Sequence, residues 1–220
     1  MHYLLHIDTS TDTGAAAIGG DGKLLAYRSN TETRNHAATI NILINEALAA
    51  ARISLQQLNA IVVCAGPGSY TGLRIGMATA KGLCYALDIP LLLDNRLKLL
   101  AYNAHGQYNA GEQFISLLLA REKEYFVSVY DNKLNSVLEP RHIMHEELNL
   151  LIDKKEGSVF ITNVPDIVNE LAISGLRIIQ DTQINFDLWI TYAFEDYKCN
   201  RIVNLAIAEP FYLKQVFTHK

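Results

Sequence analysis

The stretch Gly66-Pro67-Gly68-Ser69-Tyr70-Thr71-Gly72-Leu73-Arg74-Ile75-Gly76 decides how this chain folds. It follows a short apolar run at residues 60–65 and leads into a helical stretch at residues 77–87. Its first two glycines can adopt positive φ, its proline restricts one dihedral, and a serine or threonine can cap the helix. The pattern predicts a strand, a tight turn and a helix. Such a turn is either purely structural or a cradle that directs helix N–H groups towards an anion.

Two enzymatic interpretations of this turn fail on spacing. A Walker A loop ends in Gly-Lys-Ser/Thr, whereas Gly72 is followed here by Leu73. A nucleophile elbow needs glycine two residues before and after its serine, and Ser69 has Pro67 and Thr71 at those positions. The turn is therefore structural, an anion cradle or a partner surface. The residues that could form a nucleotide or anion cradle are Asp8, Thr9, Ser10, Gly66, Gly68 and Ser69.

Composition bounds the class of protein. The chain has 220 residues, a formal net charge of −4 and a sequence pI near 6.0, which argues against broad binding of nucleic acid. No signal peptide and no run long enough to span a membrane is visible, so we expect a cytoplasmic protein with no membrane role. Three scattered cysteines lack zinc or redox spacing and are expected to be reduced, buried thiols: Cys64, Cys84 and Cys199.

The order of predicted elements repeats once. The first half reads as strands 3–8, 13–19 and 23–29, helix 35–52, strand 60–65, helix 71–87, strand 91–93 and helix 96–104. The second half reads as strands 113–119, 125–130 and 134–139, helix 146–153, strand 158–162, helix 166–173 and strand 177–179, followed by a mostly helical region from 186 to 210. This order predicts an α/β protein with two mixed sheets flanked by helices. We place the subdomains at 1–105 and 106–220, with the terminal segment able to pack back on the first.

Three segments together resemble the TsaB family, also called YeaZ: Ile7-Asp8-Thr9-Ser10, the central glycine stretch, and Pro210-Phe211-Tyr212-Leu213-Lys214. The resemblance implies a duplicated βββαβα fold of the actin/Hsp70/sugar-kinase (ASKHA) type. It also implies a role in adding a threonylcarbamoyl group to the adenosine beside the anticodon of bacterial tRNAs. In that pathway the family member is a non-catalytic partner of the catalytic subunit TsaD, and the ATPase TsaE joins the pair. The chain departs from the family at Leu119-Ala120-Arg121, where the family usually has Asp-Ala-Arg.

The residues themselves, apart from the resemblance, also favour a chain that does not catalyse a reaction. A phosphate-binding fold of this type needs a glycine-bearing turn in each half, and the second hairpin, residues 119–125, has no glycine. The catalytic homologues place two histidines four apart on the first helix, whereas His36 is followed four residues later by Ile40. No acidic or cysteine partner lies near His142 and His145 in the sequence except Glu146 and Glu147, which we interpret as acids of a first helical turn favoured by the helix dipole. We therefore expect no metal and no cofactor.

The first two predicted helices are apolar on more than one side. A surface helix normally buries a single stripe, so the surplus is either mutual packing of these helices or the binding surface for another protein. Gly72, Gly76 and Thr79 share one flank, which we assign to the partner because Leu73 and Met77 already supply a core-facing stripe. The expected partner-binding residues are His36, Ile40, Ile44, Tyr70, Gly72, Arg74, Ile75, Gly76, Thr79 and Leu83.

Three functions remain open at this point. The first is a non-catalytic partner that forms a heterodimer with a TsaD-like subunit, supports binding of a TsaE-like ATPase and meets tRNA only within the complex. The second is an enzyme of the same fold, either an ATP-dependent phosphotransferase or a glycoprotease-like protein. The third is a scaffold that uses the same helices to form a homodimer.

Overall fold

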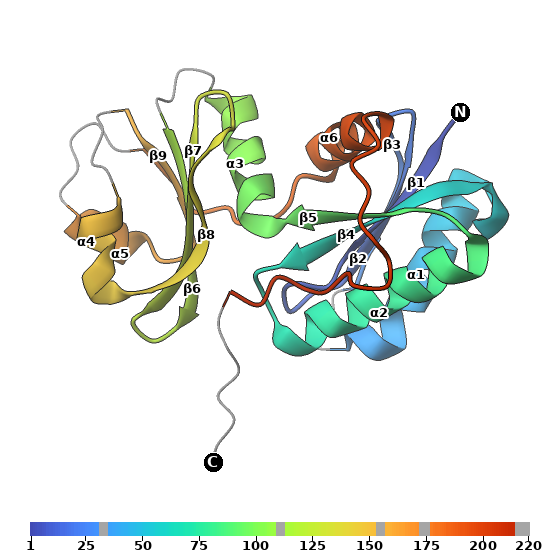
Figure 1. Ribbon diagram of the computed structural model, residues 1–220, viewed down its shortest axis with the longest axis horizontal. Coiled ribbons are helices and arrows are strands. Elements are labelled where there is room, and N and C mark those ends of the chain that lie inside the picture. The colour runs from blue at the N-terminus through green and yellow to red at the C-terminus, as the bar shows by residue number, and fades with distance from the viewer. Residues whose placement is uncertain (31–34, 109–112, 153–156, 172–176, 214–220) are drawn as a thin grey trace, which may run out of the picture. The chain divides into compact units, whose positions relative to one another are not determined.

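The computed structural model describes residues 1–30, 35–108, 113–152, 157–171 and 177–213 (Figure 1). The chain divides into two compact units. The first comprises Met1–Arg96 with Phe186–Phe211, and the second comprises Leu97–Asn185 with Tyr212–Lys220. The expected division between residues 105 and 106 falls inside a helix, α3 (Arg96–Gln107), and the chain passes between the units at the start of that helix.

A mixed five-stranded sheet with the order β3-β2-β1-β4-β5 forms the centre of the first unit. Its strands are β1 (Tyr3–Asp8), β2 (Ala15–Gly20), β3 (Lys23–Ser29), β4 (Leu58–Gly66) and β5 (Leu91–Asn95). The first three strands form an antiparallel meander, and β4 and β5 run parallel to β1. The carboxyl ends of β1, β4 and β5 therefore lie at one edge of the sheet, where ligands usually bind in open α/β sheets.

Helices cover both faces of this sheet because β1 is buried on both sides. Leu5 and Ile7 pack in a core with α1 (His36–Ala51) and α2 (Tyr70–Leu87). His6 alternates to the opposite face, where its ring contacts Trp189 of α6 (Phe186–Lys198). Figure 1 shows α6 in red beside β3 and β1, and α1 and α2 together on the other side of the sheet. A 3₁₀ turn, η1 (Leu55–Gln57), leads into β4.

The second unit repeats this plan with the strand order β10-β9-β6-β7-β8. Its strands are β6 (Gln113–Arg121), β7 (Glu124–Asp131), β8 (Ser136–Met144), β9 (Val159–Thr162) and β10 (Arg177–Ile179). Leu97, Leu100 and Ala104 of α3 pack with Phe114 on one face of the sheet. The other face is covered by η2 (His145–Glu147), α4 (Leu148–Leu151) and α5 (Pro165–Glu170).

The architecture confirms the predicted α/β class with two helix-flanked mixed sheets, and it corrects two elements of the second half. The third strand of the second half begins and ends later than expected, at β8. The helix expected at 146–153 is a 3₁₀ turn followed by α4, and residue 153 lies outside the described residues, as do residues 172 and 173 of the next expected helix.

The terminal region is helical only in α6. Beyond it the chain runs along the first unit, where the N–H group of Val203 donates to Leu91 O (3.0 Å) and that of Phe211 donates to Ala65 O (2.8 Å). Lys81 of α2 holds the same segment by donating to the carbonyl oxygens of Ala206 and Ala208 at 3.3 and 3.0 Å. The segment thus belongs to the first unit.

Candidate functional site

The turn after β1 is a buried polar cluster. The N–H group of Ser10 donates to Asp8 Oδ1 (2.8 Å), so the aspartate closes its own turn. Arg96, which begins α3 directly after β5, lies 3.6 Å from Asp8 Oδ2 and donates to Ser10 Oγ (2.7 Å). All three side chains are more than nine-tenths buried. A buried carboxylate and guanidinium compensate each other's charge, so this pair locks the turn instead of offering a charge to a ligand.

The glycine turn before α2 packs directly onto this first turn. Ser69 N–H donates to Ser10 O (2.8 Å), and a methyl group at Gly68 would overlap the Ser10 carbonyl. The Ser69 hydroxyl caps the helix by accepting from Gly72 N–H (3.2 Å). The N–H groups of Ser69 and Gly72, which an anion cradle would use, therefore already have partners inside the chain.

The flank of α2 that carries Gly72 and Gly76 faces the protein's own interior, contrary to our expectation of a partner surface. Thr9 Oγ1 donates to Gly72 O (2.7 Å), and a methyl group at either glycine would overlap Thr9. The small residues are required here because helix and turn approach backbone to backbone. The sequence showed the small residues, but it could not show that Thr9 covers them.

A second buried polar group lies on the α6 face of the sheet and was missed in the sequence. Trp189 Nε1 donates to Asp94 Oδ2 (2.6 Å), and the His6 ring is perpendicular to the Trp189 ring at 5.1 Å. His6 is fully buried, and burial lowers its pKa from 6.5 to about 3, so the imidazole stays neutral. These residues come from β1, β5 and α6, and their spacing in the sequence gives no sign of the contact.

His36, expected at the partner surface, is 5% exposed. Its Nε2 lies 2.8 Å from Thr11 O, and its ring packs against Gly14 and Gly72. Within the described ranges, no three His, Cys, Asp or Glu side chains gather closely enough to hold a metal ion. His142 instead pairs with Glu124 at 2.8 Å.

Burial also separates the three cysteines. It raises the pKa of the Cys64 thiol and raises that of Cys84 to about 12, so both thiols stay protonated. Cys199 is exposed, which corrects the expectation of three buried thiols.

The remaining predicted partner-binding residues fall into two groups. Ile40 and Ile44 are buried in the core of the first unit, and Ile75 and Leu83 are half-buried against it. Tyr70 and Arg74 are exposed, and the Arg74 guanidinium lies over the Tyr70 ring at 4.3 Å. Thr79 is intermediate in exposure.

A strip on α2 was not expected from the sequence. Its members are exposed and lie on successive turns of the helix: Ala78, then Gly82, then the adjacent Tyr85 and Ala86. Tyr85 is 84% exposed, and Ile42 on the neighbouring α1 is 55% exposed. The helix pair therefore exposes several small and apolar side chains beside polar ones such as Asn45 and Glu46, and exposed apolar side chains that gather on one surface often mark a protein-binding site.

Comparison with known proteins identifies the family. The family model for TsaD, tRNA N6-adenosine threonylcarbamoyltransferase, matches residues 24–207. The TsaB protein of Bacillus subtilis (strain 168), a tRNA threonylcarbamoyladenosine biosynthesis protein, is 32% identical over 163 residues, covering 72% of this chain and 69% of the relative. The chain belongs to the TsaB (YeaZ) family.

Solved structures share the fold of this chain. A Pseudomonas aeruginosa protein described as similar to the peptidase YEAZ superposes with a TM-score of 0.83 at 23% identity, covering 97% of this chain and all of the other. A putative N-acetylmannosamine kinase from Listeria monocytogenes reaches a TM-score of 0.52 at 12% identity, covering 89% of this chain and 99% of the other, which shows a shared fold only. The matched regions of three TsaB relatives span 56–69% of those proteins.

The hairpin at which this chain departs from the pattern expected of its family forms a tight turn between β6 and β7. β6 ends at Arg121 and β7 begins at Glu124, and Lys123 between them takes a φ of 60°. Leu119 is 45% exposed, and its N–H group donates to Asn163 Oδ1 (2.9 Å).

None of the helices in the described part of the chain is long and apolar enough to cross a bilayer.

Proposed function

We propose that this TsaB-family chain is a non-catalytic subunit of the machinery that adds a threonylcarbamoyl group to the adenosine beside the tRNA anticodon. The names of its relatives supply the pathway. The non-catalytic role rests on one observation, which is that Ser10 and Thr9 fill the glycine turn where a phosphate would have to enter.

The same observation weighs against an ATP-dependent phosphotransferase. In that fold, catalysis is positioning and electrostatic stabilisation of a phosphoryl group, which needs unpaired N–H groups or a metal ion beside it. The N–H donors of Ser69 and Gly72 are already used, and Asp8 is paired with Arg96. We expect the purified chain to hydrolyse ATP no faster than buffer, and magnesium-dependent turnover that survives repurification would refute the non-catalytic assignment.

We propose that a TsaD-like subunit binds the outer surface of α1 and α2, and that a TsaE-like ATPase joins the resulting pair. Apolar side chains exposed there, with Tyr85 the most exposed, match the aromatic and aliphatic composition of interface cores. A homodimer through the same surface would compete with this complex.

Size-exclusion chromatography with light scattering, with and without the TsaD-like protein of the same cell, tests this interface. Gly82→Arg should abolish the heterodimer while the chain stays folded, because no atom lies within 4 Å of the position that its Cβ would occupy. Leu150→Arg, at an 85% exposed position of α4, is the matched control and should bind normally. A folded Gly82→Arg chain that binds as well as the control would place the partner elsewhere.

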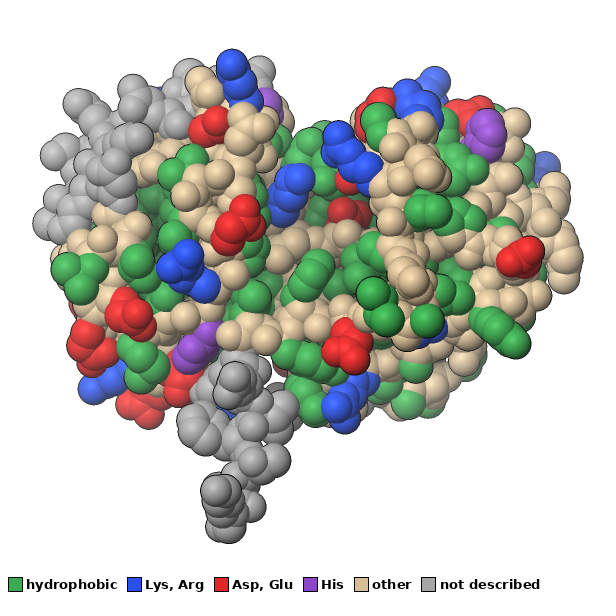
Figure 2. Space-filling view, viewed as in Figure 1, with side chains coloured by type: hydrophobic (Ala, Val, Ile, Leu, Met, Phe, Trp, Pro, Cys, Tyr) green, Lys and Arg blue, Asp and Glu red, His purple; other side chains and the backbone are tan. Residues whose placement is uncertain are grey.

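We further propose that tRNA is contacted mainly through the complex. Acidic and basic side chains are interspersed on the face in Figure 2, without a broad basic field. Non-specific affinity for nucleic acid depends on such a field and falls with salt. Micromolar or tighter binding of tRNA by the chain alone at physiological salt would contradict this part of the proposal.

A further inference from the structure

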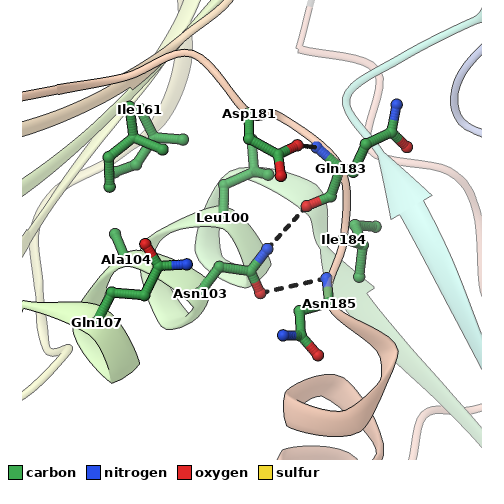
Figure 3. Close-up of a pocket in the computed structure, with 10 residues that line it drawn as sticks. Leu100, Asn103, Ala104, Gln107, Ile161, Asp181, Gln183, Ile184 and Asn185 are labelled. Atoms are coloured by element: carbon green, nitrogen blue, oxygen red, sulfur yellow. Dashed lines mark hydrogen bonds between the residues drawn. The ribbon is translucent and has the colours of Figure 1, made fainter.

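A pocket in the second unit has no part in any of the functions proposed above. It has a volume of about 220 Å³ and lies where the edge strand β10 ends, beside the C-terminal half of α3 (Figure 3). Its lining consists of Leu100, Asn103, Ala104, Gln107, Ile161, Ile179, Asp181, Gln183, Ile184 and Asn185. Because β6, β9 and β10 are parallel, the end of β10 is an edge where open α/β sheets commonly bind ligands.

Hydrogen bonds between side chains and backbone hold the wall of this pocket in place. Asn103 Nδ2 donates to Gln183 O (2.8 Å), and Asn103 Oδ1 accepts from Asn185 N–H at 3.3 Å. Gln183 N–H donates to Asp181 Oδ1 (2.9 Å), which closes the turn after β10. One asparagine of α3 thus holds residues 183–185 at two points, and the dashed lines in Figure 3 show these bonds.

Two polar groups that line the pocket have unused hydrogen-bonding capacity within the described part of the chain. No other described residue forms a hydrogen bond with the Gln107 amide or with the second carboxylate oxygen of Asp181. Asp181 is the only charged side chain among the lining residues, and no lining residue is basic. A ligand that supplies hydrogen-bond donors and positive charge is favoured there, and an anion such as phosphate is disfavoured.

The remaining lining residues indicate the chemical nature and the size of the uncharged part of the ligand. Its apolar part is wholly aliphatic, and no lining residue is aromatic, so a stacked nucleobase has no platform. Pockets for drug-sized ligands measure roughly 300–1,000 Å³, so this one accepts a smaller molecule.

We propose that this pocket binds a small aliphatic cation, a primary amine or guanidine on a short carbon chain. The cationic group donates to Asp181 and Gln107, and the carbon chain packs on Leu100, Ile161 and Ile179. The ligand would also contact residues 181–185, through which the chain leaves the second unit. This binding is independent of the proposed role in tRNA modification.

Amide NMR spectra of the full, ¹⁵N-labelled chain test the proposal with three probes of one size: n-butylammonium, 1-butanol and butyrate. Only n-butylammonium should give saturable shifts of the Asn103 and Gln107 side-chain amides and of the Gln183 backbone amide. Binding should weaken with salt because Asp181 is exposed.

Two variants separate charge at the pocket from charge elsewhere. Asp181→Asn keeps the acceptor for Gln183 N–H and should weaken n-butylammonium binding by about three- to tenfold. Glu139→Gln removes one exposed carboxylate from β8 in the same unit and should leave binding unchanged. Equal affinity for 1-butanol, preferential binding of butyrate, wild-type affinity in a folded Asp181→Asn chain, or no saturable shift with any probe would each overturn the proposal.

Discussion

The close approach of α2 to the turn after β1 can be tested with one added methyl group. Gly72 lies in the first turn of α2, and a Cβ atom there would overlap the Thr9 carbonyl oxygen and lie 3.2 Å from both His36 Cδ2 and Ser69 Oγ. The obstacle on one side is backbone, so either the helix start or the turn after β1 must move. Such a movement would also disturb the hydrogen bond from Thr9 Oγ1 to Gly72 O (2.7 Å).

The expected change in the free energy of unfolding is a sum of three effects. Overpacking costs about 1–3 kcal/mol. Loss of the buried hydrogen bond costs about 1 kcal/mol. The higher helix propensity of alanine stabilises the variant by less than ~1 kcal/mol. The net destabilisation of Gly72→Ala is about 2 kcal/mol, and at 2–4 °C per kcal/mol for a chain of this size the Tm should fall by roughly 4–8 °C.

Gly82→Ala is the matched control, because it makes the same change in the same helix with no neighbouring atom within 4 Å. It should raise stability by up to ~1 kcal/mol, since only helix propensity changes. Far-UV circular dichroism melts and urea titrations of the two variants and the wild type measure both effects. If Gly72→Ala is as stable as Gly82→Ala, the backbone contact between α2 and the turn after β1 is not as described.

Three further outcomes follow from buried groups. Gly76→Arg should unfold the first unit or lower its stability by several kcal/mol, since the position faces Thr9 in the interior; a well-folded variant in a circular dichroism melt would contradict the assignment. His6 has a folded pKa of about 3 and an ordinary value of 6.5, so the unfolded chain binds the extra proton between these pH values, and stability should fall by about 2 kcal/mol from pH 7 to pH 5. Urea titrations should show that His6→Leu lacks this share of the pH dependence, and equal slopes for the two chains would refute it. Asp94→Ala leaves the indole N–H of Trp189 buried without its acceptor and should cost about 1–3 kcal/mol in a urea titration followed by the emission of the single tryptophan. Asp94→Asn keeps an acceptor and should lose less.

Local pattern in the sequence was sufficient for most elements. The first and third strands have the predicted ends, and α2 begins one residue before the predicted helix. Alternation, glycine turns and capping residues act between neighbours along the chain, so they can be read from a single sequence. The glycine stretch with its flanking motifs also indicated the family, which the sequence comparisons confirm.

The sequence did not determine which side of a glycine-bearing helix meets the protein's own interior. Gly72 and Gly76 permit close approach by any neighbour, and the fold brings up Thr9, some 63 residues from Gly72 along the chain. His36 is a similar case, because an imidazole at a helix start is compatible with a surface, a metal or the buried contact with Thr11.

The tertiary structure alone decided the contacts between distant segments. The ion pair of Asp8 with Arg96, the hydrogen bond of Trp189 to Asp94 and the pocket closed by Asn103 each join residues from elements far apart in the sequence. Periodicity gives the face on which a residue lies, but it carries no information about which element covers that face. Sequence therefore established the two helix-flanked sheets and the family, whereas the closed glycine turn, the exposed strip of α2 and the pocket beside β10 followed only from packing.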